Sequence, residues 1–571
     1  MNRRDFLGTL GLMGGAAAFQ PAARRPNVIL IMTDDQGFGD LSCHGNPHVS
    51  TPNIDRLASQ GAEFTRFTVS SVCAPTRASL LTGRYAMRCG VHGVTHGKET
   101  MKRSEVTLGK ALQSAGYRSA LIGKWHLGEN YPYVPHAMGF DEFVGFRLGH
   151  WSRYFDSPTE RNGKPESLRR YVSDALTDEA LRFIGENRER PFFLYLAFNA
   201  PHSPYQLPDR YFDKFKTKGL EPELAAIYGM VENLDENLGR LFAKLDEWKL
   251  GNTIVVYLQD NGPQTDRYNA GLRGRKGSIY EGGTRSPFLM RWPGRIAAGK
   301  KIDSIAAHID VYPTILDLCG IQPPAGPPID GISLRPVVDG KPPAERLVFS
   351  HADHQPDPLQ PFPGAVRSQR WKMVNGTDLY DLLADPAESK NVAAQHPGVL
   401  EHLNGEYQRW FRSITDGFRV GHPPIPVGHP EENPAILSAP QAKLEGGLRF
   451  YARNGFAHDF ITGWDQPSTA ASWEIEVARG GRFDIWLEYL GGAGASAKLE
   501  IGRELLEAKI ESNGNLQPNS LPERSAHRTA APDMNWSRLR MGRLPLEPGI
   551  KTLAIRGGMT HLKSVQLRRI R

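Results

Sequence analysis

Three short apolar runs constrain the fold of the first half of this 571-residue chain. They span residues 27–33, 191–197 and 253–258 and consist almost entirely of aliphatic and aromatic side chains. Runs of this kind are typical of central strands that are buried on both faces. Such strands belong to sheets that helices cover on both sides, so we predict an α/β domain with a large buried sheet.

Polar side chains follow these runs directly. The first run ends at Asp34-Asp35, the second is followed by His202, and the third by Asp260-Asn261. Because ligands bind at the carboxyl ends of strands in open α/β sheets, we expect these groups to meet. Their carboxylate and amide oxygens suit a hard cation such as Ca²⁺ or Mg²⁺, whereas zinc would need more nitrogen or sulfur ligands. Two adjacent acids alone are more often a solvated loop, so the prediction depends on the whole set.

Basic side chains accompany this acidic set. A strand predicted over residues 117–122 leads into Lys124 and His126, which point to the same face if the chain stays extended. A glycine-rich basic loop over residues 271–287 contains Lys276. A cation with convergent basic groups is the arrangement expected for transfer of a phosphoryl or sulfuryl group.

The segment 73–84 places a cysteine two residues before Pro75 and four before Arg77. Pro75 predicts a turn, and residues 78–81 predict the first turns of a helix. At a helix start, positive partial charge and Arg77 would favour an anion, and so a thiolate at Cys73. The alternative is a buried structural cysteine.

Length, charge and cysteine content limit the class of protein. The chain is too long for one core, so we expect two to four domains. The net charge of +7 is modest, and no zinc-finger spacing, basic heptad or aromatic–basic RNA motif is present, so no nucleic-acid partner is predicted. A bridge between Cys43 and Cys89 stays an open alternative. The four cysteines are Cys43, Cys73, Cys89 and Cys319.

Residues 1–25 predict an export signal. Arg3-Arg4 and Phe6-Leu7 precede a weakly apolar run over residues 9–19, which gives a charged and then a short hydrophobic region. The paired arginines resemble a twin-arginine signal, so we predict an exported, periplasmic or extracellular protein. The run is too short to span a bilayer, and no later segment predicts a membrane span. The alternative is an ordinary disordered N-terminus.

The rest of the chain divides by its pattern. Residues 26–345 predict the α/β domain, with a helix over 305–318, and residues 346–415 a smaller α+β unit. Residues 416–440 are rich in proline and predict a linker. Residues 441–571 hold short alternating runs between turns, which predict an all-β sandwich.

Taken together, these motifs resemble the formylglycine-dependent type I sulfatases. The resemblance covers residues 26–415 and implies an alkaline-phosphatase-like fold, in which helices sandwich a large mixed sheet and a small α+β subdomain follows. The C-terminal β region lies outside it. The matching motifs are Cys73-x-Pro75-x-Arg77, Leu81-Thr82-Gly83-Arg84, Gly123-Lys124-Trp125-His126-Leu127-Gly128, Asp34-Asp35, His202, Asp260-Asn261 and residues 274–287.

The resemblance also implies a mechanism. A modifying enzyme that reads Pro75 and Arg77 would oxidise Cys73 to Cα-formylglycine, whose hydrate attacks the sulfur of a sulfated carbohydrate. The implied ligands of Ca²⁺, with Mg²⁺ less favoured, are Asp34, Asp35, Asp260, Asn261 and the modified Cys73. Arg77 and His126 would orient and deprotonate the hydrate. Lys124, His202 and Lys276 would bind sulfate, with His202 or Lys276 protonating the leaving alcohol.

Two other functions stay open at this level. One is a phosphomonoester, phosphodiester or phosphonate hydrolase on the same fold, and the other is an inactive glycan-binding protein. The β-sandwich itself could bind glycans, act as a structural lid or form a dimer contact. Its tryptophans are predicted to be buried rather than stacking platforms, and four loop segments are predicted to line the substrate pocket. The tryptophans are Trp464, Trp473, Trp486 and Trp536, and the segments are His150, Trp151, Arg153 and residues 351–354.

Overall fold

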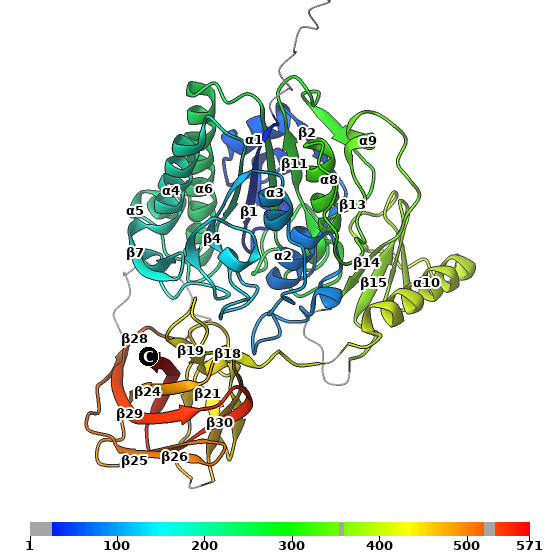
Figure 1. The fold of residues 1–571 in the computed structure, drawn as a ribbon. Helices are drawn as coiled ribbons and strands as arrows, with labels where there is room; N and C mark the ends of the chain where they lie inside the picture. Colours follow the sequence, from blue (N-terminus) through cyan, green and yellow to red (C-terminus); the bar gives the residue numbers. More distant parts are fainter. Residues whose placement is uncertain (1–24, 353–358, 419, 467, 519–530, 571) are drawn as a thin grey trace, which may run out of the picture.

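A ten-stranded mixed sheet runs through the N-terminal part of the molecule (Figure 1). The structure is a computed structural model and describes residues 25–352, 359–418, 420–466, 468–518 and 531–570. Five central strands are parallel, in the order β9-β1-β8-β4-β5, and the strands outside them add antiparallel pairs and one parallel pair, β12 with β2. In sheet order the strands are β12 (Lys300–Ile302), β2 (Ala62–Phe64), β11 (Phe288–Arg291), β9 (Thr253–Gln259), β1 (Asn27–Thr33), β8 (Phe192–Ala197), β4 (Arg118–Lys124), β5 (Glu142–Phe146), β6 (Phe155–Arg161) and β7 (Lys164–Tyr171).

The three apolar runs form β1, β8 and β9, which lie side by side at the centre of this sheet. Every residue of the three strands is buried. Since apolar side chains on both faces of a strand require cover on both faces, the runs dictate the layered arrangement that is observed. The predicted fold class is confirmed.

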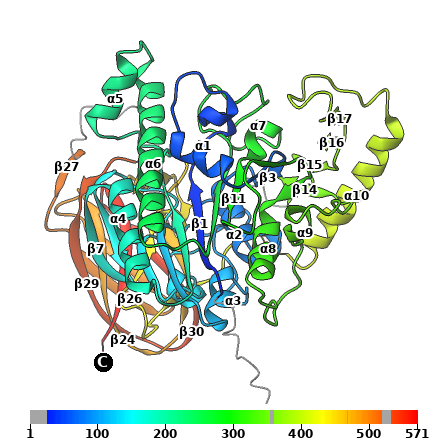
Figure 2. The same cartoon turned by 90° about the horizontal axis from the view of Figure 1, so that it is seen from above.

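Helices cover both faces of the sheet (Figure 2). Alternate residues of β1 divide between the two cores, Ile29 and Ile31 facing one and Val28, Leu30 and Met32 the other. On the first face lie α1 (Pro52–Ser59), α4 (Val172–Asn187), α5 (Asp209–Lys216) and α6 (Pro222–Glu247). On the second lie α2 (Cys73–Thr82), α3 (Leu108–Ser114) and α8 (Val311–Leu318).

The helix expected over residues 305–318 is shorter than predicted. It begins at Val311, because Ala306 and Ala307 form the short strand β13 (Ala306–Ala307) and pair with β3 (Phe67–Thr68). This backbone pairing joins segments more than 200 residues apart, so no local pattern could predict it. The third strand of that small sheet is β10 (Arg285–Ser286), which directly follows α7 (Glu281–Thr284).

The smaller α+β unit packs one helix against a four-stranded antiparallel sheet. The helix α10 buries Tyr407, Trp410 and Phe411 against the sheet, as its amphipathic sequence predicts. The elements are β14 (Val348–His351), β15 (Gly364–Arg367), β16 (Trp371–Val374), β17 (Asp378–Asp381) and α10 (Pro397–Thr415), whereas the preceding short helix α9 (Arg335–Val338) belongs to the core of the α/β domain.

The C-terminal part is a sandwich of two sheets that enclose one apolar core and lies against one end of the N-terminal part (Figure 1). One sheet contains β18 (Ile425–Val427), β20 (Lys443–Glu445), β23 (Ala470–Val477), β30 (Gly549–Gly557), β25 (Ser496–Ile501) and β26 (Glu504–Lys509). The other contains β19 (Ala435–Ser438), β21 (Arg449–Phe450), β22 (Ile461–Thr462), β31 (His561–Ile570), β24 (Gly481–Leu490) and β29 (Ser537–Leu546). A separate pair is β27 (Asn515–Pro518) with β28 (Met534–Asn535).

The segment 416–440 is more than the linker that its prolines predict. Its strand β18 pairs with β23, and its strand β19 pairs with β31, so both sheets of the sandwich recruit it. β18 is an edge strand of its sheet, so the backbone on its outer side needs no hydrogen-bond partner. Prolines are tolerated in such a strand. The sandwich therefore begins before residue 441.

Two further predictions concern the sandwich core and the membrane. Trp464 and Trp473 are buried, as predicted, whereas Trp486 and Trp536 are partly exposed. Within the part of the chain that the structure describes, no helix is long and apolar enough to cross a bilayer. The predicted export signal lies almost wholly in residues 1–24, outside the described residues.

Candidate active site

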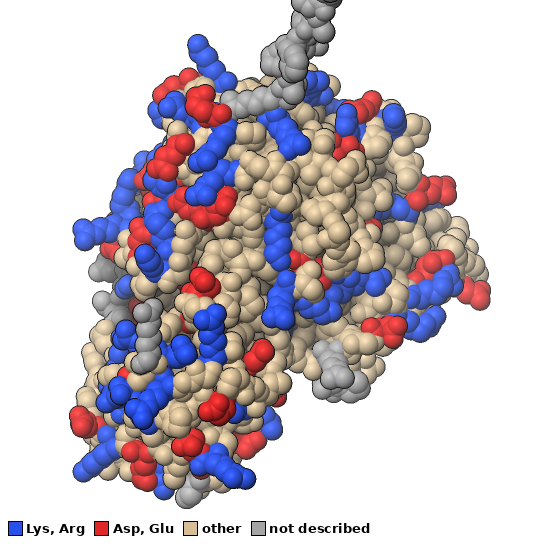
Figure 3. Space-filling model, in the orientation of Figure 1, with Lys and Arg blue, Asp and Glu red and all other residues tan. Residues whose placement is uncertain are grey.

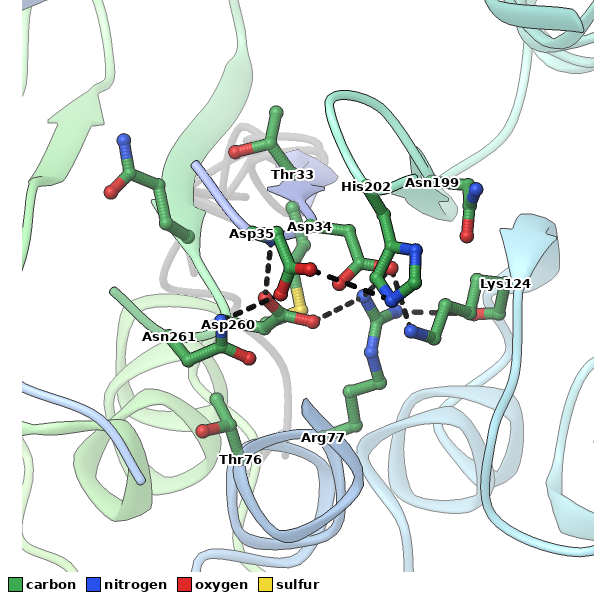
Figure 4. Close-up of polar contacts among 12 residues, drawn as sticks. Thr33, Asp34, Asp35, Thr76, Arg77, Lys124, Asn199, His202, Asp260 and Asn261 are labelled. Atoms are coloured by element: carbon green, nitrogen blue, oxygen red, sulfur yellow. Dashed lines mark hydrogen bonds and ion pairs between the residues drawn. The ribbon is translucent and has the colours of Figure 1, made fainter. Parts of the chain in front are cut away.

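Two neighbouring parallel strands deliver the acidic side chains to one point. β1 and β9 run in register up to Thr33 opposite Gln259, so the next residues, Asp34 and Asp260, emerge together. The backbone N–H of Asp35 donates to Oδ1 of Asp260 over 3.2 Å. Asp34, Asp35, Asp260 and Asn261 are all buried and converge in Figure 4, as the strand-end pattern predicts.

Cys73 is the first residue of α2 and is buried beside this acidic group. One turn further on, Arg77 donates from Nη2 to Oδ2 of Asp260 over 2.7 Å and from Nη1 to the carbonyl of Lys124 over 3.3 Å. The helix start does not produce a thiolate: burial raises the pKa of the Cys73 thiol, and the nearby lysines Lys124 and Lys276 do not offset it. The expectation of an anionic thiol is therefore wrong for the unmodified residue.

Two lysines and one histidine of the predicted set each contact an acid, and Figure 4 shows the contacts of Lys124 and His202. Nζ of Lys124 lies 2.6 Å from Oδ2 of Asp34. Nζ of Lys276, from the glycine-rich loop, lies 2.6 Å from Oδ1 of Asp35, and Nε2 of His202 lies 3.4 Å from Oδ2 of the same residue. The predicted loop and strand-end residues thus form one cluster.

Three buried oxygens of the cluster have no hydrogen-bond partner: Asp34 Oδ1, Asp35 Oδ2 and Asn261 Oδ1. Leaving such atoms without a partner costs free energy, so each calls for a ligand. Ligand atoms of Asp34, Cys73 and Asp260 also lie within 4.8 Å of one another. A group of oxygen donors of this kind fits a hard divalent cation, so the residues present fit the predicted metal.

His126 is held at the rim of the cluster in the left-handed backbone region, with φ of 60°. Its Nε2 lies 2.9 Å from the carbonyl of Val94, so this nitrogen carries the hydrogen and donates it. The other nitrogen, Nδ1, is buried without a partner and carries the lone pair. This tautomer leaves an unpartnered lone pair on Nδ1, in a ring whose pKa is lowered by its burial and by the nearby charges of Lys124 and Arg77.

Comparison with known proteins identifies the family. A family model described as "Sulfatase" matches residues 26–321, and one described as "N-sulphoglucosamine sulphohydrolase, C-terminal" matches residues 275–408.

The chain belongs to the sulfatase family.

Arylsulfatase A of Homo sapiens is 33% identical over 441 residues, which cover 69% of this chain and 84% of that protein. N-acetylgalactosamine-6-sulfatase of Canis lupus familiaris is 31% identical over 438 residues, covering 70% and 80%. The crystal structure of Ps i-CgsB in complex with k-i-k-neocarrahexaose is similar with a TM-score of 0.63 and 30% identity, covering 68% of this chain and 93% of that one.

The resemblance drawn from the motifs is confirmed, and the protein is a sulfatase that hydrolyses sulfate esters. Sulfatases generally use formylglycine and a metal, and the acidic cluster offers a possible metal site.

Neither family model reaches the β-sandwich of this sulfatase, which begins at about residue 425.

All four cysteines of the chain are free in the structure, so no bridge joins Cys43 to Cys89.

The pKa values of two neighbouring carboxylates, Asp260 and Asp35, shift in opposite directions. Burial, with the adjacent charge of Asp34, raises the pKa of Asp260 to about 7, although Arg77 opposes the shift. Burial also acts to raise the pKa of Asp35, but Lys276 and a neighbouring histidine outweigh it and hold that pKa below its usual range. The two carboxylates therefore differ in how strongly their surroundings favour the charged form, with Asp35 favoured most.

The pKa values of the basic groups also shift in opposite directions, down for the histidines and up for Lys276. Burial lowers the pKa of His202 to about 4, with Asp35 partly opposing it, and burial with the Lys124 charge holds the pKa of His126 well below its usual range. For Lys276, burial acts to lower the pKa, but the charge of Asp35 outweighs it and raises that pKa. At neutral pH the lysine is charged and both histidines are neutral.

The predicted pocket-lining residues have different fates. His150 lies beside the site, with its ring stacked on His202 at 5.3 Å between centroids, and its Nε2 is buried without a partner. Trp151 is a core residue that donates from its indole to the carbonyl of Pro158. Arg153 forms a 3.6 Å ion pair with Asp533 of the sandwich. His351 packs on Phe411 in the smaller subdomain, and residues 353–354 lie outside the described residues.

Several supporting residues were not predicted. Arg267 forms a buried ion pair with Asp40 and donates from Nη2 to the carbonyl of Asp35 over 2.9 Å. Tyr154 donates to the carbonyl of His202 over 2.6 Å. These partners are 45 or more residues apart in sequence, and no local pattern marks them as pairs.

Proposed function

We propose that this sulfatase removes sulfate from a sulfated carbohydrate at the site around Cys73. The observation that carries the proposal is the buried acidic cluster, in which three oxygens lack a hydrogen-bond partner, Asp34, Cys73 and Asp260 offer ligand atoms within 4.8 Å of one another, and lysines contact the acids. The carbohydrate part is supported by the relatives, an N-acetylgalactosamine-6-sulfatase and a protein bound to a neocarrahexaose.

A divalent cation, Ca²⁺ rather than Mg²⁺, would be held by Asp34, Asp35, Asp260, Asn261 and residue 73. Bound there, the cation would neutralise the sulfate charge and lower the pKa of a bound hydroxyl. The larger coordination number of Ca²⁺ suits a site with this many oxygen donors. Binding would also supply the three unpartnered oxygens with a ligand.

Cys73 is proposed to be converted to formylglycine by a modifying enzyme, because Pro75 and Arg77 match the family's recognition motif. The hydrate of formylglycine supplies a hydroxyl nucleophile and a second hydroxyl that allows the sulfate to be expelled. Arg77, anchored on Asp260 and on the carbonyl of Lys124, orients the side chain at residue 73.

Proton transfer is assigned to the two histidines by their tautomers. His126 presents a lone pair on Nδ1 and accepts the nucleophile's proton. His202 donates its Nδ1–H to the carbonyl of Ser203 over 2.7 Å, so Nε2 holds a lone pair in the neutral ring and acts as the acid only after taking up a proton, which the carboxylate of Asp35 at 3.4 Å favours. Lys124 and Lys276 bind sulfate oxygens, and Lys276 is the alternative acid. The high pKa of Lys276 makes it the poorer proton donor.

Export by the twin-arginine-type signal belongs to the same proposal. Residues 3–7 and 9–19 have the charged and apolar regions that such signals require. A sulfated polysaccharide outside the cytoplasm would then be accessible to the enzyme.

The test is sulfate release from 4-nitrophenyl sulfate and from a panel of sulfated oligosaccharides, with 4-nitrophenyl phosphate alongside. We expect release from the sulfates, loss with a chelator, and better recovery with Ca²⁺ than with Mg²⁺. Faster hydrolysis of the phosphate, or full activity after exhaustive chelation, would contradict the proposal. Release from the aryl sulfate but from no oligosaccharide would contradict its carbohydrate part.

A further inference from the structure

Among the places where the sandwich touches the catalytic part is a short loop between β21 and β22, residues 454–458, which we call the brace loop. Two chains of contacts lead from this loop to the two catalytic histidines, His202 and His126. Each chain passes through a single intermediate segment of the catalytic part.

The first chain runs from His458 through His150 to His202. Nε2 of His458 lies 2.8 Å from the backbone carbonyl of His150, and the two rings meet edge-on with centroids 5.6 Å apart. The ring of His150 in turn stacks on His202, at 5.3 Å and 13° between planes. The sandwich thereby fixes the ring that lies against the proposed acid.

The second chain runs through residues 94–96 to His126. The carbonyl that accepts from His126 belongs to Val94, and the next residue, Thr95, donates its hydroxyl to the carbonyl of Gly455. The imidazole of His96 lies 2.8 Å from the carbonyl of Pro440 and 3.1 Å from that of Asn454. The segment that sets the tautomer of the proposed base is therefore held by the sandwich.

The brace loop fits closely against the catalytic part. Gly455 has φ of +63°, and a Cβ at this position would lie 2.5 Å from Cε1 of His96, so a larger residue would push the two parts apart. His458 also adopts a positive φ of 67°, which is uncommon for a residue with a side chain. Surrounding contacts must hold that conformation, and the bond to His150 is one of them.

A third contact supports the same region. The backbone N–H of His126 donates to the carbonyl of Arg147 over 3.0 Å, and the guanidinium of Arg147 forms an ion pair with Glu432. Glu432 precedes β19 and also accepts from the N–H of Tyr131 over 2.5 Å. His126 and the segment after it are thus tied to the C-terminal part through Arg147 and Tyr131.

We propose that the β-sandwich is an integral part of the active site, in which the brace loop positions His202 and His126. The inference rests on the proposed function, because it gives a role to the histidines assigned there. His458 and Gly455 are positioning residues and do not touch the reacting atoms.

A positioning role and a glycan-binding role predict different kinetics. If the sandwich only bound glycans, a change at the brace loop would raise KM for oligosaccharides and leave a small aryl sulfate unaffected. If it positions the histidines, the same change lowers kcat for 4-nitrophenyl sulfate, a substrate too small to reach a separate glycan site. A misplacement of catalytic groups by about 1 Å can cost on the order of 100-fold in rate.

The test compares His458→Ala with His458→Gln in the full chain. The alanine variant loses both contacts to His150, and we expect kcat for 4-nitrophenyl sulfate to fall by about 10- to 100-fold. The glutamine variant keeps an amide N–H near the position of Nε2 and should recover most of the loss. The matched control is His561→Ala, since His561 is a histidine of the same sandwich whose ring contacts Tyr451 and Phe460 within it.

A second variant tests the other chain from the catalytic side. Thr95→Val removes only the hydroxyl that bonds Gly455, so folding of the sandwich is spared, and we expect a smaller fall in kcat with a shift in the pH dependence that His126 sets. If His458→Ala and Thr95→Val both keep kcat within twofold of the unchanged enzyme, the proposal is overturned. If the His458→Ala variant does not fold, the kcat of the Thr95→Val variant alone tests the proposal.

A readout independent of turnover separates this proposal from the proposed function. With ¹⁵N-labelled histidine, the imidazole signals of His202 should move in His458→Ala and stay in place in His561→Ala. Signals that stay in place in both variants overturn the inference. An unchanged enzyme that releases no sulfate from any substrate would instead overturn the proposed function.

Discussion

The ammonium of Lys124 lies 2.6 Å from Oδ2 of Asp34, and neither side chain has any exposed surface. The pair joins the last residue of β4 to the residue after β1, two strands separated in the sheet by β8. A buried pair of this kind contributes little net stability over apolar packing. Its retention at the strand ends is better explained by the site, where Oδ1 of Asp34 faces inward without a partner.

Replacing Lys124 by methionine should therefore damage catalysis more than it destabilises the fold. Lys124→Met removes a charge proposed to contact the developing negative charge on sulfate, and we expect kcat for 4-nitrophenyl sulfate to fall by about 100-fold or more. Steady-state kinetics measure the effect. The control is Lys244→Met, because Lys244 pairs with Glu247 on the exposed surface of α6 and its loss should leave kcat unchanged. Equal kinetics in both variants would remove Lys124 from the site.

The cysteines allow a second comparison. Cys73→Ser lacks the second hydroxyl of the proposed formylglycine hydrate, so we expect at most one sulfate transferred per enzyme and no sustained turnover. Cys89→Ser is the control, since Cys89 is also buried but its Sγ lies beside the hydroxyl of Thr82, away from the acidic cluster. Burst kinetics and mass spectrometry of the residue 73 peptide provide the measurement. Repeated turnover by Cys73→Ser, or an unconverted thiol in the active native enzyme, would refute the mechanism.

The sequence predicted the elements whose signal is local. A wholly apolar run such as residues 253–258 identifies a buried strand by itself, and the polar residues Asp260 and Asn261 follow it at once. The parallel register of β1 and β9 then brings them to Asp34 without further information. The motif at residue 73 extended this to a family and a chemistry.

The features that were missed depend on pairing between distant segments. The ion pair of Arg267 with Asp40, the strands β18 and β19 and the contact of His458 with His150 each join residues that no local pattern connects. Buried polar partners and edge pairings form wherever the folded chain supplies them, so a single sequence does not specify them. The same reason explains why the sandwich was predicted as a unit while its role stayed open among glycan binding, a structural lid and a dimer contact.

The distribution of charged side chains on the face shown in Figure 3 does not point to a particular substrate. On the face shown in Figure 3, acidic and basic side chains are interspersed over both the catalytic part and the sandwich. That face has no extended basic stripe of the kind that nucleic-acid-binding proteins present.

Gly123, directly before Lys124, gives a prediction about stability. A Cβ there would lie 1.9 Å from the carbonyl oxygen of Ala197 on the neighbouring strand β8, and φ is +116°. We expect Gly123→Ala to destabilise the fold by about 3 kcal/mol or more, seen as a large drop in the midpoint of thermal unfolding. Gly116→Ala is the control, because Gly116 also has positive φ but open space around it, and should cost only about 1–2 kcal/mol. Equal drops in the two variants would show that the close approach to β8 is unimportant.

The buried imidazole of His308 makes the folded state sensitive to acid. Its nitrogens lie 3.1 Å from the carbonyl of Thr68 and 3.2 Å from the hydroxyl of Ser70, and burial lowers its pKa to about 4. The unfolded chain takes up this proton near pH 6.5 but the folded protein does so only near pH 4. The stabilisation is therefore complete above pH 6.5 and is lost as pH falls toward 4, by about 3 kcal/mol for this one group.

His308→Gln keeps polar contacts at this position and removes the titration. We expect the variant to be somewhat less stable at pH 7.5, but its thermal midpoint should fall less than that of the unchanged protein between pH 6.5 and 4.5. His402→Gln, at an exposed position on α10, should leave the full acid-induced fall in place. The measurement is a series of thermal melts across this pH range at constant ionic strength. A parallel acid-induced fall in all three proteins would mean that His308 is not protonated on unfolding, and the buried neutral imidazole would then be the wrong description of this residue.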